Sequence, residues 1–180
     1  MSLLSAVELL ELVKDGVIEN VDRSAINAAS IDLYLGDNFF KEGFGNNQYK
    51  HLNIVHLKKR ERPSMVNYTK EVFLDPGEFC LAATKEIFHL PNNVSGSFIL
   101  KSSMGRAGLD HAMSGWADSG FNGSVLTLEL CNTLRNHILH LEAGMAIGQM
   151  IFFKHTEVPE EFLYSTKGRY NNDRTVQQMK

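Results

Sequence analysis

Short apolar runs separated by turn-forming residues make up most of the chain after residue 28. In the first run, residues 29–36, Ile31, Leu33 and Leu35 alternate with polar or amphipathic neighbours, the pattern of a half-buried strand. Further strands are predicted over residues 79–83, 86–90, 97–100, 126–131, 138–141 and 146–153, with turns at 75–77 and 91–93. Many short strands at close spacing predict a mainly β fold, a barrel or a jelly-roll-like sandwich.

One short helix is predicted ahead of the strands. Ser5 and Glu8 have the spacing of a capping box, in which the two residues satisfy each other's free backbone groups. An apolar stripe follows, made of Leu9, Leu10, Leu12 and Val13. Gly16 then suits a helix C-terminus, because glycine readily adopts the left-handed conformation found there. We therefore expect a helix over residues 5–15.

Two polar segments stand apart from this pattern. Residues 41–70 are predicted to be mostly loop with a short strand at 52–57, and their basic run at 58–63 is assigned no function. Residues 164–174 carry two tyrosines and several cations, and they form either a frayed terminus or a segment that orders over a ligand. Without repeats or low-complexity stretches, the 180 residues predict one domain.

Composition narrows the class of protein. A net charge of −3 and a pI near 6.2 argue against a nucleic-acid binder that relies on bulk positive charge, so any phosphate site must be local. No run of about 18 apolar residues and no export signal are seen, so we expect a cytoplasmic protein without membrane contact. Cys80 and Cys131 are expected to be free thiols and cannot form a CxxC site.

Polar chemistry is concentrated between residues 101 and 130. Ser102, Ser103 and Arg106 suit either the start of a short helix or a site where hydroxyls, backbone N–H groups and a cation meet an anion. Glu129 lies in a Leu-Thr-Leu-Glu-Leu alternation. A carboxylate on the core side of a strand would have a raised pKa suited to proton transfer, but the alternation points Glu129 away from the leucines. Spacing alone leaves a functional and a structural role open.

Common catalytic signatures are absent. The chain has no Walker loop, GxGxxG, GxSxG or HExxH motif, and it lacks the His-x-Glu and Pro-Cys-x-x-Cys of zinc deaminases. His137 and His140 flank a predicted strand without a partner cysteine or a nearby pair of carboxylates in the sequence, so we do not expect a metal site there. His111 lies beside the polar cluster, where substrate contact and simple solvation are equally open.

Six blocks in the same order resemble the dCTP deaminase family of the dUTPase-like superfamily, over nearly the whole chain. They are the helix that ends near Gly16, residues 27–36, residues 101–109, residues 115–123, residues 127–130 and residues 144–150. The resemblance implies a single dUTPase-like domain over residues 1–180, with a distorted β-barrel core and a short N-terminal helix. It also implies a homotrimer with active sites between subunits, in which the tail, residues 160–180, closes over the nucleotide.

The same resemblance implies hydrolytic deamination of dCTP to dUTP and ammonia, in pyrimidine deoxynucleotide metabolism. Zinc is not needed in this family, and Mg²⁺ is carried by the triphosphate. The catalytic residues carried over by position are Ser102, Arg106 and Glu129. Glu129 would take a proton from the water that attacks cytosine C4 and pass protons to the departing amine. Ser102 and Arg106 would hold the water and stabilise charge in the tetrahedral intermediate.

Substrate-binding positions follow from the resemblance as well. The substrate-binding residues carried over are Lys101, Ser103, Trp116, Asp118, Gln149, Tyr164, Arg169 and Tyr170. Of these, Lys101, Ser103 and Arg169 would contact phosphates, and Asp118 would contact the deoxyribose 3′-hydroxyl. The two tyrosines lie in the tail, which the resemblance assigns as a lid that excludes water on closure.

Departures from the family pattern keep other functions open. Lys101 stands where arginine is common, which loses the bidentate fork. Asp173 stands where a glutamine usually contacts phosphate, and a carboxylate there would repel a triphosphate unless a cation intervenes. The alternatives are a bifunctional deaminase and dUTP pyrophosphatase, a pyrophosphatase alone in which Asp118 positions the water, and a nucleotide sensor without catalysis.

Overall fold

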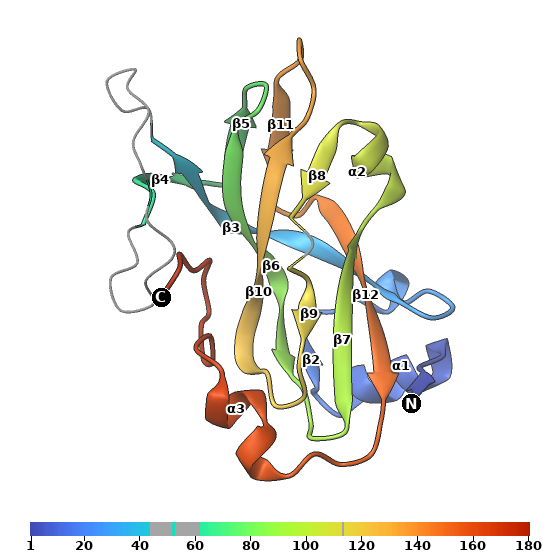
Figure 1. Ribbon diagram of the computed structural model, residues 1–180. Helices are drawn as coiled ribbons and strands as arrows, with labels where there is room; N and C mark the ends of the chain where they lie inside the picture. Colours follow the sequence, from blue (N-terminus) through green and yellow to red (C-terminus); the bar gives the residue numbers. More distant parts are fainter. Residues whose placement is uncertain (44–51, 53–61, 113) are drawn as a thin grey trace.

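Ten antiparallel strands form one curled sheet in the computed structural model, which describes residues 1–43, 52, 62–112 and 114–180 (Figure 1). The strand order along the sheet is β8 (Leu109–His111), β10 (Asn122–Asn132), β6 (Phe79–His89), β3 (Ile31–Glu42), β12 (Ala146–Lys154), β7 (Val94–Leu100) and β9 (Trp116–Ala117). Short strands β1 (Ser2–Leu3), β2 (Ile18–Glu19) and β4 (Met65–Thr69) pair with β12, β6 and β3. The predicted mainly β, barrel-like fold is confirmed.

A two-stranded ribbon, β5 (Glu71–Leu74) with β11 (Leu139–Glu142), extends from one end of this sheet (Figure 1). At the other end lies α1 (Ala6–Lys14). Four further short elements are α2 (Ser102–Arg106), α3 (Tyr164–Lys167) and the 3₁₀ turns η1 (Arg23–Ala25) and η2 (Glu160–Phe162). No helix in the described parts of the chain is long and apolar enough to cross a membrane.

The first helix forms where the capping pattern predicts it. The Ser5 backbone N–H donates to the Glu8 carboxylate at 2.9 Å, which closes the capping box. Gly16 follows with a φ of +73°, a conformation that only glycine adopts without strain. Leu9, fully buried, fixes the apolar face of the helix on the core.

The observed strands differ from the expectation in several places, and the short strands β1, β2, β5, β8 and β9 were not predicted. The runs at 79–83 and 86–90 form one strand, β6. Strand β10 pairs with it before and after the polar Thr84 and Lys85, across a register shift, and β3 pairs with Thr84 on the other side. Strand β4 was missed, because most of its side chains are exposed and show no apolar alternation. The predicted strand at 52–57 lies outside the described residues except for Leu52. The other runs form β3, β7, β10, β11 and β12.

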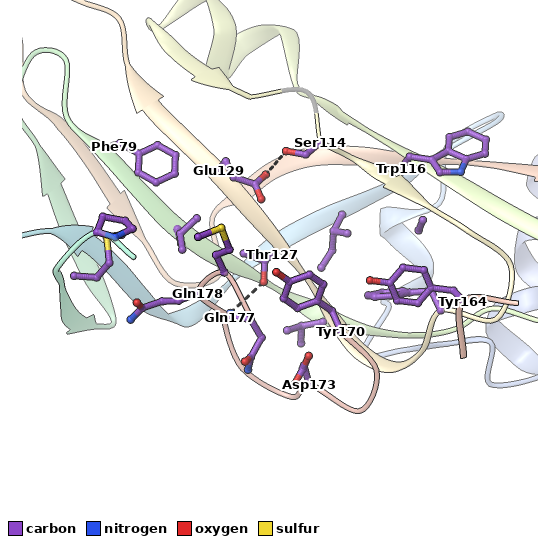
Figure 2. A pocket seen from close by; sticks show the side chains of 18 of the residues that line it. Phe79, Ser114, Trp116, Thr127, Glu129, Tyr164, Tyr170, Asp173, Gln177 and Gln178 are labelled. Atoms are coloured by element: carbon purple, nitrogen blue, oxygen red, sulfur yellow. Dashed lines mark hydrogen bonds between the residues drawn. The ribbon is translucent and has the colours of Figure 1, made fainter. Parts of the chain in front are cut away.

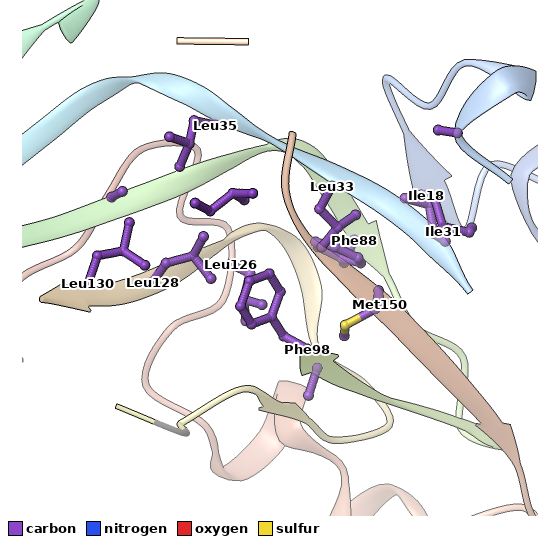
Figure 3. Packing of buried hydrophobic residues seen from close by; sticks show 14 of the residues in the cluster. Ile18, Ile31, Leu33, Leu35, Phe88, Phe98, Leu126, Leu128, Leu130 and Met150 are labelled. Carbon is purple, nitrogen blue, oxygen red and sulfur yellow. The ribbon is translucent and has the colours of Figure 1, made fainter. Parts of the chain in front are cut away.

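The core fills the concave side of the sheet. Leu128 and Leu130 on β10 are fully buried and point to the same side as Leu33 on β3, Met150 on β12 and Phe98 on β7 (Figure 3). Each buried aliphatic or aromatic side chain of this kind stabilises the fold by about 1.5–3 kcal/mol. The two cysteines are free, as predicted. This packing holds β10 rigidly and leaves the opposite face of the strand available for polar residues.

One carboxylate lies inside this packing. Glu86 is only 1 % exposed, and its Oε2 accepts a hydrogen bond from the Tyr34 N–H at 3.1 Å. Burial raises the pKa of Glu86 from 4.5 to about 7, although the Tyr34 hydrogen bond acts in the opposite direction. Glu86 is therefore a proton-binding group of the folded state.

We expect Glu86 to make stability fall as pH rises. Between pH 4.5 and about 7 the folded chain keeps the proton that the unfolded chain loses, so the free energy of unfolding decreases with pH and levels off above that window. Glu86→Gln should remove this dependence, and its stability relative to the parent should be higher at pH 8 than at pH 4 by on the order of 3 kcal/mol. Urea unfolding at both pH values, at equal protein concentration, measures it, and an unchanged difference would contradict it.

Candidate active site

Glu129 lies at the wall of a cavity on the face of β10 opposite the core. Its neighbours Leu128 and Leu130 are fully buried, whereas the Glu129 side chain is 27 % exposed, so it is not on the core side of the strand. It pairs across the sheet with Leu81 of β6, which lines the same cavity. The cavity has a volume of about 460 Å³, within the range of small-molecule sites. Its walls are mostly apolar around a few polar groups (Figure 2).

Two groups meet one oxygen of the Glu129 carboxylate. The Ser114 hydroxyl donates to Oε2 at 2.8 Å (Figure 2). Nε2 of His111 lies 3.4 Å from the same oxygen, in an orientation that makes no hydrogen bond, so this buried nitrogen has no partner among the described residues. His111 is 7 % exposed, which decides against simple solvation. Oε1 accepts no hydrogen bond from the described residues and remains available to a ligand.

The C-terminal tail packs over this cavity. It runs along β10, where the Val125 N–H donates to the Asp173 carbonyl at 2.9 Å and the Gln177 N–H donates to the Thr127 hydroxyl at 3.2 Å. Val176, 4 % exposed, packs in a small apolar cluster with Val125. The tail residues that line the cavity are Tyr164, Tyr170, Asp173, Gln177, Gln178 and Met179. The tail is thus packed against its own chain rather than frayed.

The two predicted tyrosines and Trp116 form the other end of the cavity. Tyr164 packs edge-on against Phe121, with ring centroids 5.4 Å apart, and burial raises the pKa of its phenol. Trp116, 54 % exposed, donates from its indole N–H to Asp118 Oδ1 at 2.7 Å. Asp118 is therefore held beside the cavity, although it does not line it. The aromatic rings offer flat apolar surfaces to a planar ligand.

An ion pair neutralises the carboxylate that departs from the family pattern. Lys180 Nζ lies 2.7 and 2.6 Å from the two oxygens of Asp173. The Lys180 N–H also donates to the Tyr170 hydroxyl at 3.2 Å, and the Arg169 guanidinium donates to the Lys180 carbonyl at 3.5 Å. Lys180, a cation of the same segment, therefore offsets the expected repulsion between Asp173 and a phosphate. Arg169 lies beside Lys180.

Other predicted binding residues form a second group away from this cavity. Lys101 Nζ lies 2.6 Å from Asp32 Oδ2, and Gln149 donates to Asp32 Oδ1 at 3.1 Å. Burial raises the pKa of Asp32, but hydrogen bonds from Lys101, Gln149 and Asn27 outweigh it and hold that pKa below its usual range. Neither Lys101 nor Gln149 lines the Glu129 cavity.

The predicted serine and arginine residues of α2 belong to this second group. Ser102, Ser103 and Arg106 are exposed, and within the described chain their side chains make no hydrogen bond or ion pair. Lys101 precedes them directly and is anchored by Asp32. Within a single chain, the structure does not bring Ser102 and Arg106 into the wall of the cavity that contains Glu129.

The sequence-based interpretation of the histidines needs one correction. His140 does have carboxylates nearby: its Nε2 lies 2.8 Å from Glu71 and 3.7 Å from Glu142, because β5 and β11 pair. These three side chains could offer one ligand atom each to a metal ion, but all are exposed, and none lines the cavity. His137 is not part of this cluster.

Sequence reasoning missed two hydroxyls that contact the site. Ser114 touches Glu129, and Thr127 lies two residues before Glu129 on the same face of β10. The alternation of the strand could have pointed to Thr127. No sequence signal marks Ser114, because its contact depends on how the segment after β8 folds back towards β10.

The chain is similar to known proteins over most of its length. The sequence profile of the dCTP deaminase-like family matches residues 3–155. The chain is 40 % identical over 154 residues to a protein of Mycobacterium marinum named "dCTP deaminase, dUMP-forming", covering 84 % of this chain and 78 % of the relative. It is 33 % identical over 159 residues to a protein of the same name from Hydrogenobaculum, covering 87 % and 85 %.

One solved structure is similar to this chain in fold. The 2′-deoxycytidine 5′-triphosphate deaminase of Agrobacterium tumefaciens superposes with a TM-score of 0.62 at 20 % identity, over 83 % of this chain and 47 % of that one. This chain therefore spans about half the length of that protein. The curled sheet, the order of the sequence blocks and the family profile lead to one conclusion: the chain belongs to the dCTP deaminase-like family.

Proposed function

We propose that this protein deaminates dCTP and then cleaves the resulting dUTP to dUMP and pyrophosphate. The observation that carries the proposal is Glu129, a carboxylate with one free oxygen at the wall of a cavity of about 460 Å³, in a chain of this family. The relatives are named dUMP-forming, which favours this bifunctional reaction over the release of dUTP that the sequence analysis favoured. The balance is dCTP + 2 H₂O → dUMP + NH₃ + pyrophosphate.

In the first step, Glu129 acts as general base and then as general acid. Its carboxylate takes one proton from a water molecule while the water oxygen bonds to cytosine C4. Glu129 passes this proton to the ring nitrogen N3, and it then transfers the proton of the new C4 hydroxyl to the amine, so that the C4–N bond breaks and ammonia leaves as the C4 carbonyl forms. Ser102 and Arg106 hold the water and stabilise the charge that develops on the intermediate. This assignment rests on the family resemblance of residues 101–109 and 127–130.

In the second step, Asp118 positions the water that attacks the triphosphate. The indole N–H of Trp116 holds the Asp118 carboxylate in place at a distance of 2.7 Å. By the family resemblance, Asp118 also contacts the 3′-hydroxyl of the sugar. Lys101, Ser103 and Arg169 bind phosphates, while Tyr164 and Tyr170 close over the nucleotide with the tail. The water oxygen bonds to the α-phosphorus, the bond from that phosphorus to the bridging oxygen breaks, and pyrophosphate leaves dUMP behind.

A homotrimer completes the site. The two residue groups described above, one around Glu129 and one on α2, are separate within one chain, and α2 is exposed and unpaired along its polar side chains. If α2 of one subunit lies at the Glu129 cavity of the next, both residue groups meet at one site. Rotation about the trimer axis repeats this contact at each of the three sites. Separation within one chain and exposure of α2 support this assembly.

Mg²⁺ enters with the nucleotide in this proposal, and zinc is not required. Mg²⁺ prefers phosphate oxygens and water, and it would neutralise the triphosphate charge when bound. The carboxylate of Asp118 lies beside the cavity and could accept a hydrogen bond from water coordinated to the ion. Asp118 therefore fits an ion that arrives on the substrate.

The test follows ammonia and pyrophosphate in the same samples of purified protein. We expect dCTP to yield both products in equal amounts, and dUTP to yield pyrophosphate, after zinc chelation and resupply of Mg²⁺. Ammonia alone would support a deaminase that releases dUTP. Pyrophosphate from dUTP without ammonia from dCTP would replace the proposal with a pyrophosphatase, and binding without either product would indicate a sensor. Activity restored only by zinc would refute the metal assignment.

A further inference from the structure

Ser114 is the one side chain whose hydroxyl bonds the Glu129 carboxylate in the described structure. The Oγ to Oε2 distance is 2.8 Å, a normal length for a hydroxyl donating to a carboxylate. Ser114 is exposed and lines the same cavity as Glu129 (Figure 2). It comes from the segment between β8 and β9, and the two residues are 15 positions apart in the sequence.

Backbone contacts hold this segment on both sides of Ser114. The Ala112 N–H donates to the Glu129 carbonyl at 3.0 Å, which joins the segment to β10 itself. The Phe98 N–H donates to the Gly115 carbonyl at 2.7 Å, which joins it to β7. A Cβ at Gly115 would lie 2.9 Å from the Phe98 carbonyl oxygen, so only glycine allows this close approach. Backbone hydrogen bonds to β10 and β7 therefore fix the chain on either side of Ser114 and bring its side chain close to Glu129.

The buried imidazole of His111 lies beside the same oxygen. Its Nε2 atom has no hydrogen-bond partner and lies 3.4 Å from Glu129 Oε2, while its ring packs edge-on against Phe98 with centroids 4.9 Å apart. Ser114 and His111 thus approach Oε2 together. Oε1 is left as the oxygen that can face the reacting water.

We propose that Ser114 is a positioning residue, which fixes Oε2 of Glu129 beside the His111 ring and thereby directs Oε1 at the water. The inference rests on the proposed function of Glu129. Ser114 itself transfers no proton and contacts no substrate. Its hydroxyl selects one rotamer of the carboxylate, and a base in the correct geometry reacts faster than one that samples several.

Steady-state kinetics of Ser114→Ala test this role. We expect kcat for ammonia release to fall by about 10- to 100-fold, the equivalent of one hydrogen bond to a charged group, while KM stays within about twofold. Ser114→Thr retains the hydroxyl and should recover kcat to within roughly threefold. Ser24→Ala is the matched control, because Ser24 is exposed on η1 and makes no side-chain hydrogen bond in the described chain.

A second measurement does not depend on activity. The side-chain carboxyl carbon of Glu129, labelled with ¹³C and assigned with Glu129→Gln, should move its resonance in Ser114→Ala and not in Ser24→Ala. If the parent protein releases no ammonia, the proposed function fails, and this resonance still tests the positioning. Unchanged kcat in an active protein, a raised KM at unchanged kcat, or an unmoved resonance would each overturn the role of Ser114.

Discussion

Glu129→Gln is expected to abolish ammonia release from dCTP while nucleotide binding survives. The amide keeps the shape of the side chain and its acceptor oxygen for Ser114, but it cannot accept the proton from water. Loss of a general acid and base lowers kcat by about 100- to 10,000-fold. Ammonia release under saturating dCTP, together with calorimetric titration of the nucleotide, measures both parts of the prediction.

The matched control is Glu157→Gln, because Glu157 is exposed and no described residue bonds its side chain. It removes the same charge at a distance from the cavity and should leave kcat unchanged. Near-normal ammonia release by Glu129→Gln would refute the proposed chemistry. Loss of binding along with activity would instead make Glu129 a ligand for the nucleotide.

The second large effect is restoration of activity by mixing two inactive variants. Glu129→Gln damages one residue group and Arg106→Ala damages the other, and Arg106 is exposed, so neither change should unfold the chain. If each site combines Glu129 of one subunit with Arg106 of another, some sites in mixed trimers contain neither change. A random 1:1 mixture should recover about a quarter of the parent activity.

Co-expression of the two variants with different tags, followed by tandem purification, removes the homotrimers, and the mixed trimers that remain should show about a third of the parent activity. The control is a mixture of Glu129→Gln with a chain that carries both changes, which forms no intact site. Activity no higher than in this control would show that both groups act within one chain or that the assembly is different.

Much of the fold follows from local patterns. The helix at residues 6–14 formed because Ser5, Glu8 and Gly16 specify its two ends within a few residues of each other. The strands with apolar alternation formed where expected, because one face of each packs on the core. The exposed strand β4 gave no such signal, and the polar centre of β6 suggested a break that pairing on both sides overrode.

The candidate site was predicted in part. The resemblance of the sequence blocks identified Glu129, Trp116, Tyr164 and Tyr170, which the fold brings to one cavity. It also identified Ser102 and Arg106, which lie outside that cavity within one chain. Their roles stay predictions that the two experiments above address.

By itself, the sequence determined the mainly β class, the first helix and the family, because these depend on local spacing and on residues in a fixed order. Only the tertiary structure decided which polar groups meet. Lys101 reaches Asp32 across 69 residues, and His140 reaches Glu71 across another 69. Ser114 meets Glu129 because the segment after β8 folds back onto β10. Such contacts arise from strand pairing between distant segments, and no local pattern encodes which residues that pairing places side by side.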